Sequence, residues 1–297
     1  MVSIAVMHSS SKLTWTTWRL VNAIRDHGCR PLHITPDRIT VCIDNESCPV
    51  KYMGRCLDVD AVIVRSIGVF LRLEQFIRRI AMLKHIEENG IFVINPPDSL
   101  VLARDKYTSL RILARNNLPV PRTMLTEEPQ EALETVSRWG CVVIKPIIGS
   151  RGIGSMKIDN PDLAYYIVSY LMSYGYPLYI QEYIEKKDNR DIRAFVVGER
   201  VVAAMYRVAT SGSWKTNIAQ GAKPEPARLS SELEEAAIKA TRVLGLHYAG
   251  VDIGEKTSGG YTIFEVNAMP AWRGLYQATN VDPAKYIVEY ILERVKK

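Results

Sequence analysis

The chain has no run of 18 or more apolar residues, so no stretch of it is long enough to span a membrane as a helix. Cysteine is scarce: there are 5, and none has the C-x-x-C spacing of a zinc or redox site. The 5 histidines form no ligand pair at helical or hairpin spacing, so we assign none to a metal. Without a signal peptide, these features predict a cytoplasmic protein with reduced thiols at Cys29, Cys42, Cys48, Cys56 and Cys141.

Several nucleotide-binding and catalytic motifs are missing as well. No G-x-G-x-x-G follows the first predicted strand, and no Gly-Lys-Ser/Thr completes a Walker A loop, which argues against both of those site types. No Ser-His-Asp or Cys-His arrangement indicates a covalent nucleophile. The net charge of +6 is spread along the chain rather than gathered in a block, which favours acidic small molecules over nucleic acid.

The 297 residues are enough for two or three domains, and we place boundaries at the Pro96-Pro97 break and near residue 185. Residues 1–97 alternate strand and helix patterns, beginning with a buried strand at residues 1–7 and a helix at 14–27. Residues 42–51 are polar and unperiodic, and we interpret them as a loop. The predicted class is α/β with α+β parts: a small domain at 1–97, a central unit at 98–184 and a C-terminal unit at 185–297.

Two strand patterns near the C-terminus, 248–254 and 261–267, flank a Gly-containing turn and predict an antiparallel hairpin. Side chains alternate along a strand, so Glu265 and Asn267 share a face, and Asp252 can face them from the partner strand. Such an oxygen set suits Mg²⁺. The alternative is that these residues simply form a solvated face.

Two lysines stand next to features that bind anions. Lys106 follows Asp105, a plausible helix N-cap, and Lys145 ends a predicted strand just before a loop with three glycines. Flexible glycine backbone can turn its N–H groups toward phosphate. The competing interpretations are a solvated lysine and an ordinary hairpin connection.

Two further stretches are ambiguous when taken alone. The strand end at residues 181–184 offers acceptors that an adenine and a ribose could use, but it can also be an ordinary strand end. Asp191 and Arg193 share one strand face, where the simplest interpretation is a surface ion pair.

The order and spacing of these motifs resemble the ATP-grasp superfamily, and within it the RimK-like α-L-glutamate ligases, over essentially the whole chain. The resemblance implies that phosphate, metal and substrate groups share one site. Asp252, Glu265 and Asn267 would bind two Mg²⁺ or Mn²⁺ ions, and Arg193, Arg207 and Asn217 would lie near the γ-phosphate and the carboxylate substrate. The implied ATP-binding residues are Lys106, Lys145, Gly149, Ser150, Arg151, Gly152, Ile153, Gly154, Ser155, Gln181, Glu182, Tyr183, Ile184 and Asp191, the last on the ribose side.

The resemblance implies a ligase that activates an acceptor carboxylate as an acyl phosphate and joins it to L-glutamate. It also implies a homodimer or homotetramer, with no nucleic-acid or membrane partner. Val208, Ala219 and Gln220 depart from the basic pattern of the ribosomal-protein-modifying branch, and loop 267–274 is more similar to the archaeal branch that extends coenzyme tails.

The acceptor is therefore expected to be a pterin, tetrahydromethanopterin. The alternatives are the deazaflavin coenzyme, a ribosomal-protein C-terminus and an amino-acid carrier protein. A synapsin-like, non-catalytic ATP-binding protein is an alternative of another class. Trp214 and Trp272 could stack on a ring of the acceptor or could only pack their loops.

Overall fold

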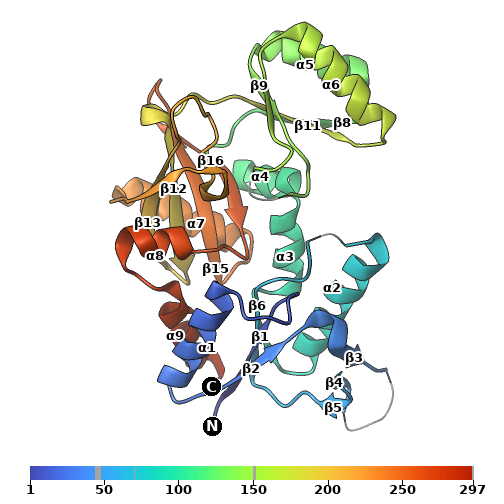
Figure 1. Cartoon of the computed structure of the whole chain (residues 1–297), viewed down its shortest axis with the longest axis vertical. Helices are drawn as coiled ribbons and strands as arrows, with labels where there is room; N and C mark the ends of the chain where they lie inside the picture. The colour runs from blue at the N-terminus through green and yellow to red at the C-terminus, as the bar shows by residue number, and fades with distance from the viewer. Residues whose placement is uncertain (44–47, 70, 150–151, 296–297) are drawn as a thin grey trace.

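The structure is a computed structural model that describes residues 1–43, 48–69, 71–149 and 152–295. Figure 1 shows the N-terminal elements at the bottom, the C-terminal sheet above them on the left, and a smaller unit at the upper right. Each of these three parts contains a β-sheet and helices, in agreement with the predicted mixed α/β class.

The N-terminal domain is built on a parallel sheet in the order β2 (Arg30–Ile34), β1 (Ser3–Met7), β6 (Ala61–Val64) and β7 (Phe92–Ile94). Alternate residues of β1 pack toward α1 (Trp15–Asp26) on one face and toward α2 (Leu73–Glu88) on the other. Both faces of the strand are therefore covered, as is usual in parallel sheets. The expected buried first strand is confirmed.

A three-stranded sheet follows β2: it comprises β3 (Ile39–Val41), β4 (Val50–Tyr52) and β5 (Arg55–Cys56), after the 3-10 turn η1 (Pro36–Arg38). Cys48 and Cys56 form a disulfide with their Cα atoms 5.7 Å apart. Our expectation of reduced thiols is wrong for this pair, because the β4–β5 hairpin brings together two cysteines that are 8 residues apart in the sequence. The expected loop at 42–51 is likewise wrong at its C-terminal end, because residues 50 and 51 belong to β4. Residues 44–47 lie outside the described residues.

Two helices, α3 (Pro97–Arg104) and α4 (Lys106–Arg115), lead to the central unit. Its antiparallel sheet has the order β10 (Met156–Ile158), β9 (Val142–Ile144), β11 (Leu178–Glu182) and β8 (Thr123–Thr126). The helices α5 (Pro129–Trp139) and α6 (Pro161–Ser173) pack against each other and against this sheet. Its buried residues form a hydrophobic cluster of their own.

The C-terminal sheet is antiparallel, in the order β14 (Lys223–Pro226), β13 (Arg200–Val208), β12 (Arg190–Val197), β15 (Tyr248–Glu255) and β16 (Tyr261–Asn267). The helix α7 (Ser231–Val243) covers one face, while α8 (Arg273–Thr279) and α9 (Pro283–Val295) cover the other. Two 3-10 turns, η2 (Lys187–Asn189) and η3 (Ile218–Gln220), flank the first hairpin. The predicted β15–β16 hairpin is confirmed, with Asp252 opposite Glu265.

The hydrophobic clusters show which parts pack together. One cluster joins β1 and α1 of the N-terminal domain to β12 and α9 of the C-terminal sheet, so these two regions share a core. The central unit contributes mainly to its separate cluster. In the part of the chain that the structure describes, no helix has the length and apolar character needed to cross a membrane.

Candidate active site

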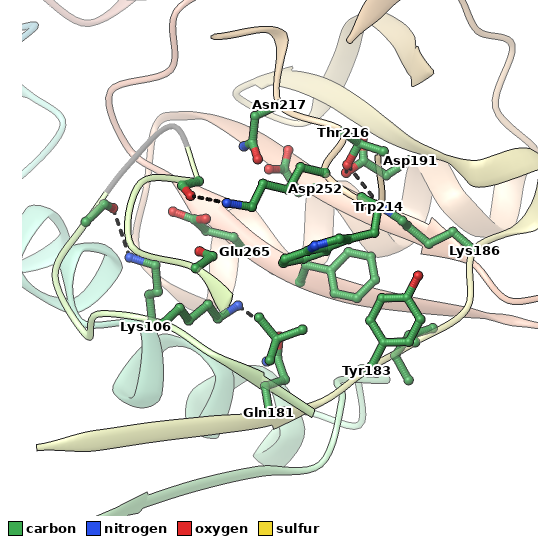
Figure 2. A pocket seen from close by; sticks show the side chains of 18 of the residues that line it. Lys106, Gln181, Tyr183, Lys186, Asp191, Trp214, Thr216, Asn217, Asp252 and Glu265 are labelled. Atoms are coloured by element: carbon green, nitrogen blue, oxygen red, sulfur yellow. Dashed lines mark hydrogen bonds between the residues drawn. The ribbon is translucent and has the colours of Figure 1, made fainter. Parts of the chain in front are cut away.

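A cleft lies between the central unit and the C-terminal sheet (Figure 2). Together with the solvent at its open mouth, it encloses about 900 Å³ of empty space. Most of the predicted site residues line it. They are Lys106, Lys145, Gly149, Gly152, Ile153, Ser155, Gln181, Glu182, Tyr183, Ile184, Asp191, Arg207, Asn217, Asp252 and Glu265.

Lys106 and Lys145 bring two amines to this cleft. Lys106 begins α4, and the N-cap Asp105 accepts hydrogen bonds from backbone N–H groups of the first turn at 2.9 and 3.1 Å, as predicted. Lys106 Nζ donates to the carbonyl oxygen of Gly149 at 2.9 Å, and Lys145 Nζ donates to Gln181 Oε1 at 2.9 Å. Lys106 is only 9% exposed, so the solvated-lysine interpretation is wrong for it.

Burial lowers the pKa of both amines, and that of Lys145 falls to about 8. The negative charge of Glu265 acts in the opposite direction on each of them, without offsetting the cost of burial. Two cations removed from water in one cleft favour an anionic ligand, because such a ligand compensates the lost hydration.

The glycine-rich loop contacts the loop that contains Asn217 across the cleft. A Cβ atom built on Gly152 would lie 2.5 Å from Asn217 Oδ1, so the two chains approach closely there. Lys215 Nζ donates to the carbonyl oxygen of Gly152 at 3.3 Å. Gly154 lies against Pro146 and does not line the cleft. Ser150 and Arg151 lie outside the described residues.

The end of β11 forms another wall of the cleft. Gln181 is 3% exposed, and its amide donates to Thr123 Oγ1 at 3.1 Å while its carbonyl oxygen accepts from Lys145. Its side chain therefore orients Lys145. The carboxylate of Glu182 accepts from the backbone N–H and Nε of Arg122 at 2.9 and 2.6 Å, so each of its oxygens has a partner within the protein.

A buried network of alternating charges crosses the C-terminal sheet. Arg207 donates to both carboxylate oxygens of Asp191, at 2.7 and 2.8 Å, and also contacts Asp252 at 2.9 Å. Arg193 pairs with Asp252 rather than with Asp191. These side chains are 6 to 11% exposed, so the surface-ion-pair interpretation of Asp191 and Arg193 is wrong.

Opposing effects determine the ionisation of Asp252 and Arg207. Burial alone would raise the pKa of Asp252, but Arg193 and Arg207 outweigh it and hold that pKa below its usual value. Burial alone would lower the pKa of Arg207, but Asp191 and Asp252 raise it. Asp252 and Arg207 are thus both charged at neutral pH, and because Asp252 is buried the solvated-face interpretation is wrong for it.

Glu265 differs from Asp252 in its surroundings. Within the described residues its carboxylate has no hydrogen-bond or ion-pair partner, although it lines the cleft (Figure 2) and its negative charge acts on both Lys106 and Lys145. An unpaired carboxylate is a suitable ligand for a hard cation. Asn267 shares its face, and Asn267 Oδ1 accepts from Met269 N at 2.9 Å. Of the three predicted magnesium ligands, Glu265 is therefore the most available, because both oxygens of Asp252 are paired with Arg193 or Arg207.

Three polar residues beside Trp214 line the cleft without any sequence signal that pointed to the site. Lys186 is half-buried, and Lys186 Nζ donates to the carbonyl oxygen of Trp214 at 3.1 Å and to Thr216 Oγ1 at 3.0 Å. Thr216 Oγ1 in turn donates to Asp191. Lys186 lies in a charged, loop-like stretch, so no local pattern separated it from solvated lysines. The polar cleft residues without such a signal are Lys186, Lys215 and Thr216.

The two tryptophans that we singled out have different environments. Trp214 lines the cleft, whereas Trp272 is 0% exposed and packs against Phe195 and the guanidinium of Arg65. Trp272 Nε1 donates to Asp282 Oδ1 at 3.0 Å. The ring-stacking interpretation is therefore wrong for Trp272, which packs the core between the N- and C-terminal regions.

Comparison with known families gives a match along almost the whole chain. Residues 2–100 match the RimK PreATP-grasp domain, and residues 103–291 match the RimK-like ATP-grasp domain. The chain belongs to the RimK-like ATP-grasp family. The resemblance inferred from the sequence is confirmed, and this RimK-like protein is an ATP-grasp ligase, which argues against the non-catalytic alternative.

Curated relatives and solved structures agree with this assignment. The RimK-like chain is 33% identical to a tetrahydromethanopterin:α-L-glutamate ligase of Methanosarcina acetivorans, covering 93% of this chain and 95% of that protein. It is 37% identical to the protein of the same name from Methanocaldococcus jannaschii, covering 89% of each. Its fold is similar to that of the ATP-grasp ligase PsnB complexed with a precursor variant, Mg and ADP. That comparison has a TM-score of 0.81 and 22% identity over 99% of both chains.

Proposed function

We propose that this RimK-type protein is an ATP-dependent α-L-glutamate ligase that joins L-glutamate to a carboxylate of tetrahydromethanopterin. The observation that carries the chemistry is the cleft, in which two buried lysines, paired arginines and an unpaired carboxylate meet. The acceptor is supported by the near full-length similarity to tetrahydromethanopterin:α-L-glutamate ligases.

In the proposed reaction, a carboxylate oxygen of the acceptor attacks the γ-phosphorus of ATP, the bond to the bridging oxygen breaks, and ADP leaves. The amine of L-glutamate then attacks the acyl carbon. The bond between the acyl carbon and the oxygen that links it to phosphorus breaks, so phosphate leaves with that oxygen. The amine loses a proton as the amide forms. Lys106 and Lys145 would bind the phosphates, and Arg193, Arg207 and Asn217 would orient the γ-phosphate and the carboxylate substrate.

The remaining site residues would bind the nucleotide and its cations. Residues 149–155 would cover the phosphates, residues 181–184 would meet the adenine, and Asp191 would lie on the ribose side. Asp252, Glu265 and Asn267 would hold Mg²⁺ or Mn²⁺, two ions per site. When bound, these ions supply charge neutralisation during phosphoryl transfer. The protein would be cytoplasmic and would form a homodimer or homotetramer. Its domain boundaries would lie near residues 97 and 184.

The same chemistry on another acceptor is the second candidate, because a probable α-L-glutamate ligase of Rhodopirellula baltica, with no acceptor in its name, is 31% identical over 97% of this chain. The deazaflavin coenzyme, a ribosomal-protein C-terminus and an amino-acid carrier protein are the acceptors to compare.

The test is to incubate the purified chain with ATP, Mg²⁺, L-glutamate and one acceptor at a time. We expect mass spectrometry to detect an added glutamyl residue on tetrahydromethanopterin, with ADP release that requires both the acceptor and glutamate. Glu265→Gln should abolish this turnover while the circular dichroism spectrum stays unchanged. Glutamate found only on another acceptor would replace the pterin, and ADP release independent of every acceptor and amino acid would contradict the ligase.

A further inference from the structure

Trp214 is the large aromatic side chain whose role in the cleft the proposed reaction does not explain. Its indole points into the cleft and lies toward Tyr183 in Figure 2. The two rings meet edge to face, with centroids 6.2 Å apart. An aromatic face directed into a ligand cleft is suited to stacking on a flat ring.

Hydrogen bonds from Lys186 hold the chain around Trp214 in place. Its carbonyl oxygen accepts from Lys186, and the same amine also donates to Thr216 Oγ1, two residues further along the chain. Thr216 in turn donates to Asp191, the residue proposed for the ribose side. Trp214 is thus anchored beside the residue that would contact the sugar of a nucleotide.

Other residues distinguish the two ends of the cleft. Lys106 and Lys145 mark the end that would bind phosphates, together with Glu265. Trp214 instead neighbours the end of β11, where Tyr183 contributes its ring and the main chain offers polar groups that suit the edge of a base. Apolar surface for the flat faces of a base also comes from Val143 and Phe264.

We infer that Trp214 stacks on the adenine ring of ATP rather than on a ring of the acceptor. The inference rests on the proposed function, because the acceptor carboxylate must reach the terminal phosphate at the lysine end. A rigid acceptor ring beside Tyr183 would have to occupy the position of the base. Trp214 therefore contributes to the affinity for the base of the nucleotide and not to the affinity for the acceptor.

The test measures binding of Mg·ADP and of inorganic tripolyphosphate by calorimetry, with neither glutamate nor acceptor present. Trp214→Ala should weaken ADP binding about tenfold, as expected for the loss of one base–aromatic stack, and should leave tripolyphosphate binding within about twofold of the parent. Trp214→Phe keeps an aromatic face and should retain most of the ADP affinity.

Tryptophan fluorescence gives a second measurement. The chain has 5 tryptophans, and Trp18 is a matched control because it is 46% exposed and lies outside the cleft. ADP should change the emission of the parent and of Trp18→Phe but not that of Trp214→Phe. The acceptor KM of Trp214→Ala, measured at saturating ATP, should stay unchanged.

Two results would overturn the inference. Equal weakening of ADP and tripolyphosphate would mean that Trp214 only supports its loop, and a raised acceptor KM with normal ADP affinity would assign the indole to the acceptor. Because ADP binding is measured without acceptor, a failure to detect any glutamate transfer would contradict the proposed function and leave this test valid.

Discussion

Lys145 is the residue whose charge should control nucleotide affinity near neutral pH. Burial lowers its pKa from the ordinary lysine value to about 8, so the amine loses its proton as pH rises through 8. Nucleotide phosphates are already fully ionised there. If only the charged amine binds phosphate, ADP should bind about tenfold more weakly at pH 9 than at pH 7. Calorimetric titrations across this range measure the effect.

Lys145→Arg is the matched control, because a guanidinium stays charged throughout that range. Its ADP affinity should vary little with pH, even if the hydrogen bond to Gln181 is altered and the affinity at pH 7 is lower. An equally steep pH dependence in the arginine variant would assign the titration to another group.

At the scale of single residues, the sequence predicted the groups whose placement is local. Strand alternation placed Asp252 and Glu265 on one face, and the position after an N-cap drew attention to Lys106. The partners of these groups were not predictable. Arg193 pairs with Asp252 from another strand, and Trp272 is buried by residues that are distant in sequence. Neither contact can therefore be predicted from a periodic pattern in the sequence.

Gly152 is an element-scale position, because it lies where two loops meet over the cleft. Its φ of +70° favours glycine, and an added Cβ would also lie 2.5 Å from Asn217 Oδ1. Gly152→Ala should therefore reduce ligase turnover about tenfold or more by displacing Asn217. The accompanying loss of stability should be about 1 kcal/mol, the cost of a left-handed alanine. Turnover assays and thermal melts measure the two effects.

Gly175 provides a matched control, since it has the same φ of +70° but open space around its missing Cβ. Gly175→Ala should show the same modest loss of stability with normal turnover. If both variants lose activity equally, the close approach of Gly152 to Asn217 is not what matters.

Whole elements were predictable where a pattern is continuous, and less so where distant chain segments combine. The hairpin of β15 and β16 and the first helix follow from alternation and helical periodicity. The β3–β4–β5 sheet and its disulfide do not follow from any such pattern, because the three strands are two or three residues long and too short to show a periodicity.

For the whole molecule, Asn95 joins the N-terminal domain to the C-terminal sheet. It follows β7 and is 0% exposed. Its amide donates to the carbonyl oxygens of Tyr248 and Ala268, each at 2.8 Å. Its own carbonyl oxygen accepts from the backbone N–H groups of His247 at 2.7 Å and Tyr248 at 3.1 Å. Both donors and both acceptor sites of one side chain are thus used across the domain boundary.

Asn95→Ala should therefore lower the free energy of unfolding by about 3 kcal/mol or more, because it leaves several buried backbone groups without partners. Asn116→Ala is the control: it removes one hydrogen bond at the end of α4 and should cost about 1 kcal/mol or less. Urea denaturation followed by circular dichroism and by tryptophan fluorescence measures both losses. Because the N-terminal domain and the C-terminal sheet share a hydrophobic core, the two probes should report one transition in the parent chain. Equal losses in the two variants would mean that Asn95 does not couple the domains.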